Sequence, residues 1–137
     1  MLDLVLCVDD DPITLMLCKM VIKKAGFATE IITAQNGEEA INYFDELNLN
    51  NLGSTISRYP QLVFLDLNMP VMGGWEFLDH YLKNNYDSIF KECKIIVLSS
   101  TIDPYDIQKA KTYPMVLDFI SKPITKEILE ELETALK

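Results

Sequence analysis

Five polar residues stand just after short runs of apolar residues, where a chain typically leaves the interior of a protein. They are Asp9, Asp10, Asp66, Ser99 and Lys122. Three carboxylates brought together repel one another, and a hard divalent cation such as Mg²⁺ removes that repulsion by oxygen ligation. A carboxylate can also attack phosphorus to form an aspartyl phosphate, while a cation and an ammonium group neutralise the transferring oxygens. If the fold gathers these residues, they form a site for Mg²⁺ and phosphoryl chemistry.

Five apolar segments are expected to be strands, and a helical pattern follows each of them. The strands are expected over residues 4–8, 28–34, 62–65, 95–98 and 116–120. The helices are expected between Asp11 and Gly26, over 37–47, after Gly74, from Pro104 to about Thr112, and after Pro123, with a turn of helix as an option within 84–92. Such alternation predicts an α/β fold with a doubly wound, five-stranded parallel sheet.

The spacing of apolar residues indicates which helix faces should be buried. In the first helix the inward face is expected to hold Ile13, Met16, Leu17, Met20 and Val21, with Asp11 as N-cap and Pro12 at the first position. In the last helix it is expected to hold Ile128, Leu132, Ala135 and Leu136. The helix from Pro104 has a thin apolar stripe and should be the least firmly anchored. Residues 48–60 are expected to form a long loop away from the site.

The order of the strands decides whether the polar residues meet. Five-stranded sheets of this flavodoxin-like kind commonly have the order 2-1-3-4-5, and ligands bind where that order reverses, beyond the carboxyl ends of strands 1 and 3. This order brings Asp9, Asp10 and Asp66 into one crevice. Ser99 then lies beside the crevice, and Lys122 reaches it on a long side chain.

Composition limits the kind of protein and its partners. The chain has 137 residues, of which 49% are hydrophobic, and a net charge of −9. One domain over residues 1–137, without an output domain, is expected. The acidic balance argues against nucleic acid, and the apolar runs are too short to cross a membrane. Three isolated cysteines and the lack of a leader pattern predict a cytoplasmic protein with reduced, buried thiols.

Other kinds of site are poorly supported by the sequence. Acids and a proline follow the first strand, where a phosphate-binding loop would need glycines. The only histidine, His80, falls within an expected helix. A dinucleotide site, a serine-histidine nucleophile and a zinc site are therefore disfavoured.

Four short motifs, in order and at this spacing, resemble the receiver domain of two-component response regulators, in particular the stand-alone regulators of the chemotaxis type. The resemblance covers nearly the whole chain. Its motifs are Val8-Asp9-Asp10, residues 64–70 (Phe-Leu-Asp-Leu-Asn-Met-Pro) with Gly74, Leu98-Ser99-Ser100, and residues 119–123 (Phe-Ile-Ser-Lys-Pro).

The resemblance implies a role for each matching residue. Asp66 would accept the phosphoryl group, and Asp9, Asp10, Asp66 and the backbone carbonyl of Asn68 would hold Mg²⁺. Lys122 and Ser99 would contact the phosphoryl oxygens, and the bond between Lys122 and Pro123 would be cis. Phe119 would be the switch aromatic, although it lacks the hydroxyl of the more usual tyrosine. Asn68 and Thr101 would tune the rate of dephosphorylation.

The function expected from this resemblance is a signalling switch in a phosphorelay, not an enzyme acting on a separate substrate. A histidine kinase or a histidine phosphotransfer protein would be the phosphodonor. The surface of the helix from Pro104, the fifth strand and the last helix would then change and be read by an output protein in trans. Homodimers through that surface are a further option within the family.

Two alternatives use the same residues differently. A non-phosphorylated interaction module would have the same fold, and the complete set of acids, hydroxyl and lysine argues against it. A Mg²⁺-dependent phosphohydrolase with an aspartyl nucleophile would typically have Asp-x-Asp after the first strand and a cap for its substrate. Here the candidate nucleophile follows the third strand, within Asp66-Leu67-Asn68.

Overall fold

Five parallel strands form the centre of the molecule in the order β2-β1-β3-β4-β5. A computed structural model describes residues 1–50 and 58–136 of the chain. The strands are β1 (Leu2–Val8), β2 (Ala28–Ala34), β3 (Leu62–Asp66), β4 (Lys94–Ser99) and β5 (Val116–Ser121). The flavodoxin-like order predicted from the sequence is confirmed, and β1 and β3 are neighbours at the reversal of strand order.

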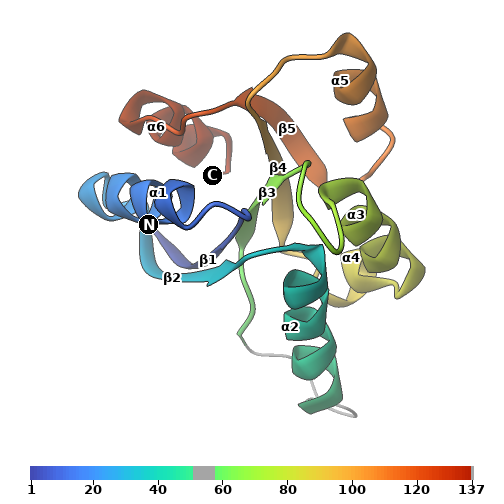
Figure 1. The fold of residues 1–137 in the computed structure, drawn as a ribbon. Coiled ribbons are helices and arrows are strands. Elements are labelled where there is room, and N and C mark those ends of the chain that lie inside the picture. Colours follow the sequence, from blue (N-terminus) through green and yellow to red (C-terminus); the bar gives the residue numbers. More distant parts are fainter. Residues whose placement is uncertain (51–57, 137) are drawn as a thin grey trace.

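Helices cover both faces of the sheet (Figure 1). They are α1 (Pro12–Lys24), α2 (Gly37–Asn50), α3 (Gly74–Lys83), α4 (Tyr86–Ile89), α5 (Pro104–Ala110) and α6 (Lys126–Ala135). Helices α1 and α6 share one core cluster with the sheet, and α2 and α3 share the other. Five helices were expected. The sixth, α4, is the turn of helix that was given as an option within residues 84–92.

Predicted caps fix the beginnings of two helices. The Asp11 side chain accepts a hydrogen bond from the Ile13 backbone N–H at 3.0 Å, with a proline at the first helical position of α1. Asp103 caps α5 in the same way, accepting from the Tyr105 N–H at 2.9 Å. These caps satisfy backbone donors that a helix leaves free at its beginning.

Helix α2 is longer than expected and shortens the predicted 48–60 loop. Residues 48–50 are helical, and Arg58–Pro60 lead into β3. Residues 51–57, the centre of that predicted loop, lie outside the described part of the chain. The helix remains regular to Asn50 because its last turn is built of Leu47, Leu49 and asparagines without a glycine or proline.

Burial in α1 is opposite to the prediction for four of five residues. Ile13, Met16, Leu17 and Met20 are 64, 54, 51 and 47% exposed, whereas Val21 is partly buried. The buried residues are Leu15, Cys18 and Ile22. Both sets repeat every three or four residues, because α1 is apolar on nearly all sides. Spacing alone therefore could not decide which set faces the sheet.

The inward face predicted for the last helix is right for three residues and wrong for one. Leu132 is buried and Ala135 is exposed, while Ile128 and Leu136 are partly buried. Leu129, which was not expected inside, is fully buried. Most of the other positions of the helix are polar, and four of them are glutamates, so the apolar residues of its central turn take the inward position.

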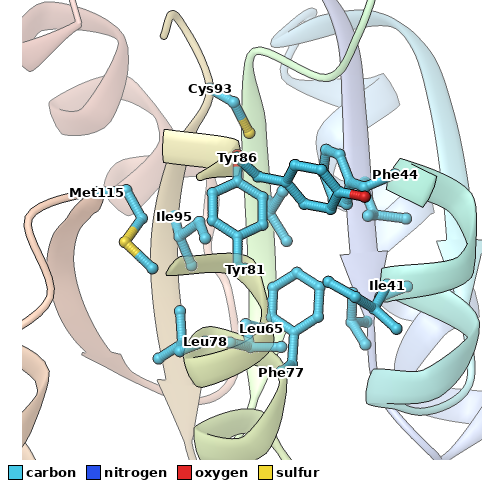
Figure 2. Packing of buried hydrophobic residues seen from close by; sticks show 14 of the residues in the cluster. Ile41, Phe44, Leu65, Phe77, Leu78, Tyr81, Tyr86, Cys93, Ile95 and Met115 are labelled. Atoms are coloured by element: carbon cyan, nitrogen blue, oxygen red, sulfur yellow. The ribbon is translucent and has the colours of Figure 1, made fainter. Parts of the chain in front are cut away.

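An aromatic cluster fills the core between the sheet and α2, α3 and α4. Phe44 lies at its centre, with ring centroids of Tyr81 and Phe90 at 5.2 and 5.1 Å. Figure 2 shows Phe44, Tyr81 and Phe77 converging between the helices and the sheet. All three are completely buried. This packing holds α2 and α3 against the strands that carry the polar residues.

Candidate functional site

Three aspartates meet at the carboxyl ends of β1 and β3. Asp9, Asp10 and Asp66 each offer a carboxylate oxygen, and the three oxygens lie within 4.8 Å of one another. Asp9 and Asp66 are only 5 and 6% exposed, whereas Asp10 faces solvent. The local reason is that β1 is apolar and buried from Leu4 to Val8 and β3 from Leu62 to Leu65, so Asp9 and Asp66 appear where these buried runs end.

Lys122 lies between two of these carboxylates. Its Nζ donates to Asp9 Oδ2 at 2.6 Å and lies 3.2 Å from Asp66 Oδ1. Burial raises the pKa of Asp66; the Lys122 charge opposes that rise and the Asp9 charge adds to it. Burial alone would lower the pKa of Lys122, but its bond to Asp9 and the charge of Asp66 raise it overall. The ammonium group is thus held charged between the two acids.

Ser99 ends β4 beside these residues. It is 2% exposed, and its Oγ accepts a hydrogen bond from the Thr101 backbone N–H at 3.2 Å. The Lys122 backbone N–H donates to the Ser99 carbonyl at 2.8 Å, which ties the end of β4 to the chain after β5. The peptide bond between Lys122 and Pro123 is cis, as expected.

The remaining predicted residues lie on the adjoining loops and on β5. Asn68 and Thr101 are exposed, each two residues beyond a buried residue of the site. Phe119 is half-buried on β5 and lines a cavity of about 120 Å³ with Ile107 and Ala110 of α5. Their roles in metal binding, switching and rate control remain predictions.

The donor set fits a hard divalent cation. Carboxylate oxygens are the ligands that Mg²⁺ prefers, and it commonly bridges one or two of them to a phosphate. Three such oxygens gather here, and one positively charged side chain is already bound between two of them. The residues present therefore match the cation expected from the sequence.

Helix α1 has an exposed apolar surface made of residues that were predicted to face the core. Ile13, Met16, Leu17 and Met20 form an exposed ridge that begins two residues after Asp11. Hollows of about 410 Å³ flank it, one lined by Met16, Met20 and Gln35 and the other by Leu17, Lys122 and Ile124. One feature of the sequence could have indicated this exposed surface: the helix has more apolar residues than a single buried face requires.

Trp75 connects α3 to the chain around α5. Its ring stacks on Tyr113 at a centroid distance of 5.9 Å, and Lys109 Nζ lies 4.7 Å from the indole centroid. The Tyr113 hydroxyl also donates to Asp79 at 2.6 Å. Helix α5 was expected to be weakly anchored, and within the helix itself only Ala110 is buried. These contacts with α3 supply anchoring that apolar spacing did not reveal.

Within residues 1–50 and 58–136, no helix combines the length and the apolar character needed to span a bilayer.

Comparison with known proteins gives a consistent result. The family model described as "Response regulator receiver domain" matches residues 5–134. A hybrid signal transduction histidine kinase C of Dictyostelium discoideum is 30% identical over 92% of this chain and 9% of its own length. An uncharacterized response regulatory protein of Staphylococcus epidermidis is 30% identical over 96% of this chain and 45% of its own. The chain thus spans less than half the length of these curated relatives.

Solved structures agree with the family model. A two-component response regulator from Cytophaga hutchinsonii is 32% identical with a TM-score of 0.85, covering 98% of this chain and 96% of its own. The chemotaxis response regulator CheY4 of Vibrio cholerae, at 24% identity, shares the fold with a TM-score of 0.73 and full coverage of both chains. The extent of these matches shows that the chain belongs to the receiver domains of two-component response regulators.

Proposed function

We propose that this receiver domain is a phosphoacceptor switch in which Asp66 takes a phosphoryl group from a histidine kinase or a histidine phosphotransfer protein. The observation that carries the proposal is the gathering of Asp9, Asp10 and Asp66 around Lys122. Mg²⁺ would be held by these three carboxylates and by the backbone carbonyl of Asn68. When bound, the ion would neutralise charge on the transferring phosphoryl oxygens.

The chemistry assigns a distinct task to each side chain. An Asp66 carboxylate oxygen attacks phosphorus, the bond from phosphorus to the donor imidazole nitrogen breaks, and its electron pair stays on that nitrogen. Lys122 already lies 3.2 Å from Asp66, so its ammonium group can pair with the new phosphoryl oxygens. The buried Ser99 hydroxyl, on the neighbouring strand, can donate to them.

Output would follow from the phosphoryl group itself, which carries a charge of about −1.5 to −2 at neutral pH. Movement of Ser99 would displace the loop that leads to α5, and Phe119 would repack beside that helix. The surface of α5, β5 and α6 would then be read by a second protein or by a second copy of the chain. Asn68 and Thr101, exposed on the loops around the site, are proposed to set the phosphorylation lifetime.

The decisive experiment treats the purified chain with acetyl phosphate in the presence of Mg²⁺. Intact-mass and peptide mass spectrometry should show one phosphoryl adduct on Asp66 that is lost in Asp66→Asn and on chelation of Mg²⁺. No Asp66-dependent adduct, with no fluorescence response of Trp75 to Mg²⁺, would favour the interaction module instead. Multiple turnover on small phosphomonoesters would favour the phosphohydrolase.

The exposed ridge of α1 is proposed to dock the phosphodonor. It adjoins the crevice, and a ridge between two hollows suits packing against helices of a partner. We expect Leu17→Gln with Met20→Gln to slow phosphotransfer from an autophosphorylated histidine kinase about tenfold or more, since central apolar contacts dominate interfaces. The kinase used is the one that phosphorylates the unaltered chain fastest in a panel.

Two controls separate docking from damage to the site. Phosphorylation by acetyl phosphate should be unchanged in the α1 variant, because no protein surface is needed for a small donor. Leu49→Gln, on a residue 64% exposed at the end of α2, should leave both donors unaffected. Equal slowing with both donors would rule out the docking role of α1.

A further inference from the structure

The loop after the proposed phosphoacceptor has a strained conformation. Val71 has φ of 69°, which is unfavourable for a β-branched residue, and its side chain is 71% exposed. The Met72 N–H donates to the Pro70 carbonyl at 2.7 Å and closes a three-residue turn around Val71. Such a turn persists only where surrounding contacts impose it. The exposed Val71 side chain does not supply those contacts.

One of the contacts that hold this turn in its conformation comes from the beginning of α2. The Gly37 N–H donates to the Met72 carbonyl at 2.8 Å. Gly37 is the first residue of α2, where a helix has backbone donors without partners of its own. The helix is capped by Asn36, whose side chain accepts from the Glu39 N–H at 2.8 Å. The capped helix end therefore offers the loop a donor in a fixed position.

Space rather than backbone conformation requires a glycine at this position. A Cβ atom on Gly37 would lie 2.8 Å from both the Met72 Cγ and the Met72 carbonyl oxygen, and 2.9 Å from the Gly73 carbonyl oxygen. Two of these three atoms are backbone and cannot swing away. In contrast to Gly26, Gly37 does not have a positive φ, so alanine could adopt its conformation.

We propose that Gly37 is a positioning residue for the metal and phosphoacceptor site. It allows the first turn of α2 to approach residues 72–73 and so holds the loop that runs from Asp66 to α3. That loop includes Asn68, whose backbone carbonyl is a proposed ligand of Mg²⁺. A methyl group at position 37 would push the loop away and displace Asn68 from its place beside Asp66. The inference rests on the proposed function of this site.

The test compares Gly37→Ala with Glu38→Ala, an exposed neighbour in the same turn of α2. In ¹⁵N-resolved NMR spectra without metal, Gly37→Ala should shift the amides of residues 67–74 while those of α6 stay in place. Titration with Mg²⁺, followed by the same amides, should show about tenfold weaker binding, as is usual when the support of a ligand is lost. With acetyl phosphate, the Mg²⁺ concentration for half-maximal rate should rise, while the rate at saturation should change little.

A second pair of variants covers the case in which Gly37→Ala folds poorly. Glycine at position 71 accepts many backbone angles, so Gly37→Ala with Val71→Gly should fold with the loop displaced. The double variant should still bind Mg²⁺ about tenfold more weakly than Val71→Gly alone, by the same loss of ligand support. Equal Mg²⁺ affinity in that pair, or unshifted loop amides in Gly37→Ala, would overturn the inference. Failure of the unaltered chain to bind Mg²⁺ or to be phosphorylated would instead overturn the proposed function.

Discussion

Replacing Lys122 with methionine should abolish most phosphorylation of the chain and markedly lower its stability at neutral pH. Methionine keeps much of the apolar stem but removes the ammonium group that contacts both Asp9 and Asp66. The side chains of these two aspartates, which are 7 and 9% exposed, then repel each other without this cation between them. Removing one partner of a buried ion pair typically costs about 3–5 kcal/mol, and urea unfolding should show a loss near the lower end because Lys122 is partly exposed.

Magnesium should restore a large part of the stability lost in Lys122→Met. Ligands that bind only the folded state stabilise it by mass action, and Mg²⁺ would replace the missing positive charge among the three aspartates. The gain in unfolding free energy on adding Mg²⁺ should therefore be larger in Lys122→Met than in the unaltered chain. Lys126→Met, on an exposed residue at the beginning of α6, should change neither the free energy of unfolding nor its gain on adding Mg²⁺. A loss of stability that Mg²⁺ does not reduce would contradict this account of the site.

The strand order and the meeting of the acids could be predicted because two simple signals agree. Strands that are apolar on both faces belong to a parallel sheet, and the polar residues that end them must gather at one edge. Asp9 and Asp66 lie on neighbouring strands for this reason, and Lys122 arrives at the end of β5. The strand order itself was taken from the order common to such sheets, and the type and position of residues along the chain supplied the rest.

The features that could not be predicted depend on contacts between distant segments. In α1, the set containing Leu15 and the set containing Met16 have the same helical period, and only packing against the sheet and α6 selects the first. The Gly37 contact joins α2 to a loop 35 residues further along the chain (72 minus 37). A glycine at the beginning of a helix carries no local signal that a distant carbonyl will approach it.

The Phe44→Ala variant should show the largest loss of stability among single changes in the core. Phe44 is completely buried in α2, and its ring centroid lies within 5.1–6.3 Å of those of Phe77, Tyr81, Tyr86 and Phe90. Removing a buried phenylalanine ring typically costs about 3–5 kcal/mol, because apolar contacts are lost and a cavity remains. Against a usual total of about 5–15 kcal/mol, urea denaturation should detect a large shift of the midpoint.

Phe44→Leu is the matched control, because leucine fills part of the same space and should cost clearly less. The loss should also extend to the site, since α2 carries Phe44 in its middle and Gly37 at its beginning. Looser packing of α2 would release Met72, so the folded fraction of Phe44→Ala should bind Mg²⁺ more weakly than Phe44→Leu. A loss below about 1 kcal/mol would show that the cavity collapses and that neighbouring rings replace Phe44. Unchanged Mg²⁺ affinity would show that the first turn of α2 is held independently of the aromatic core.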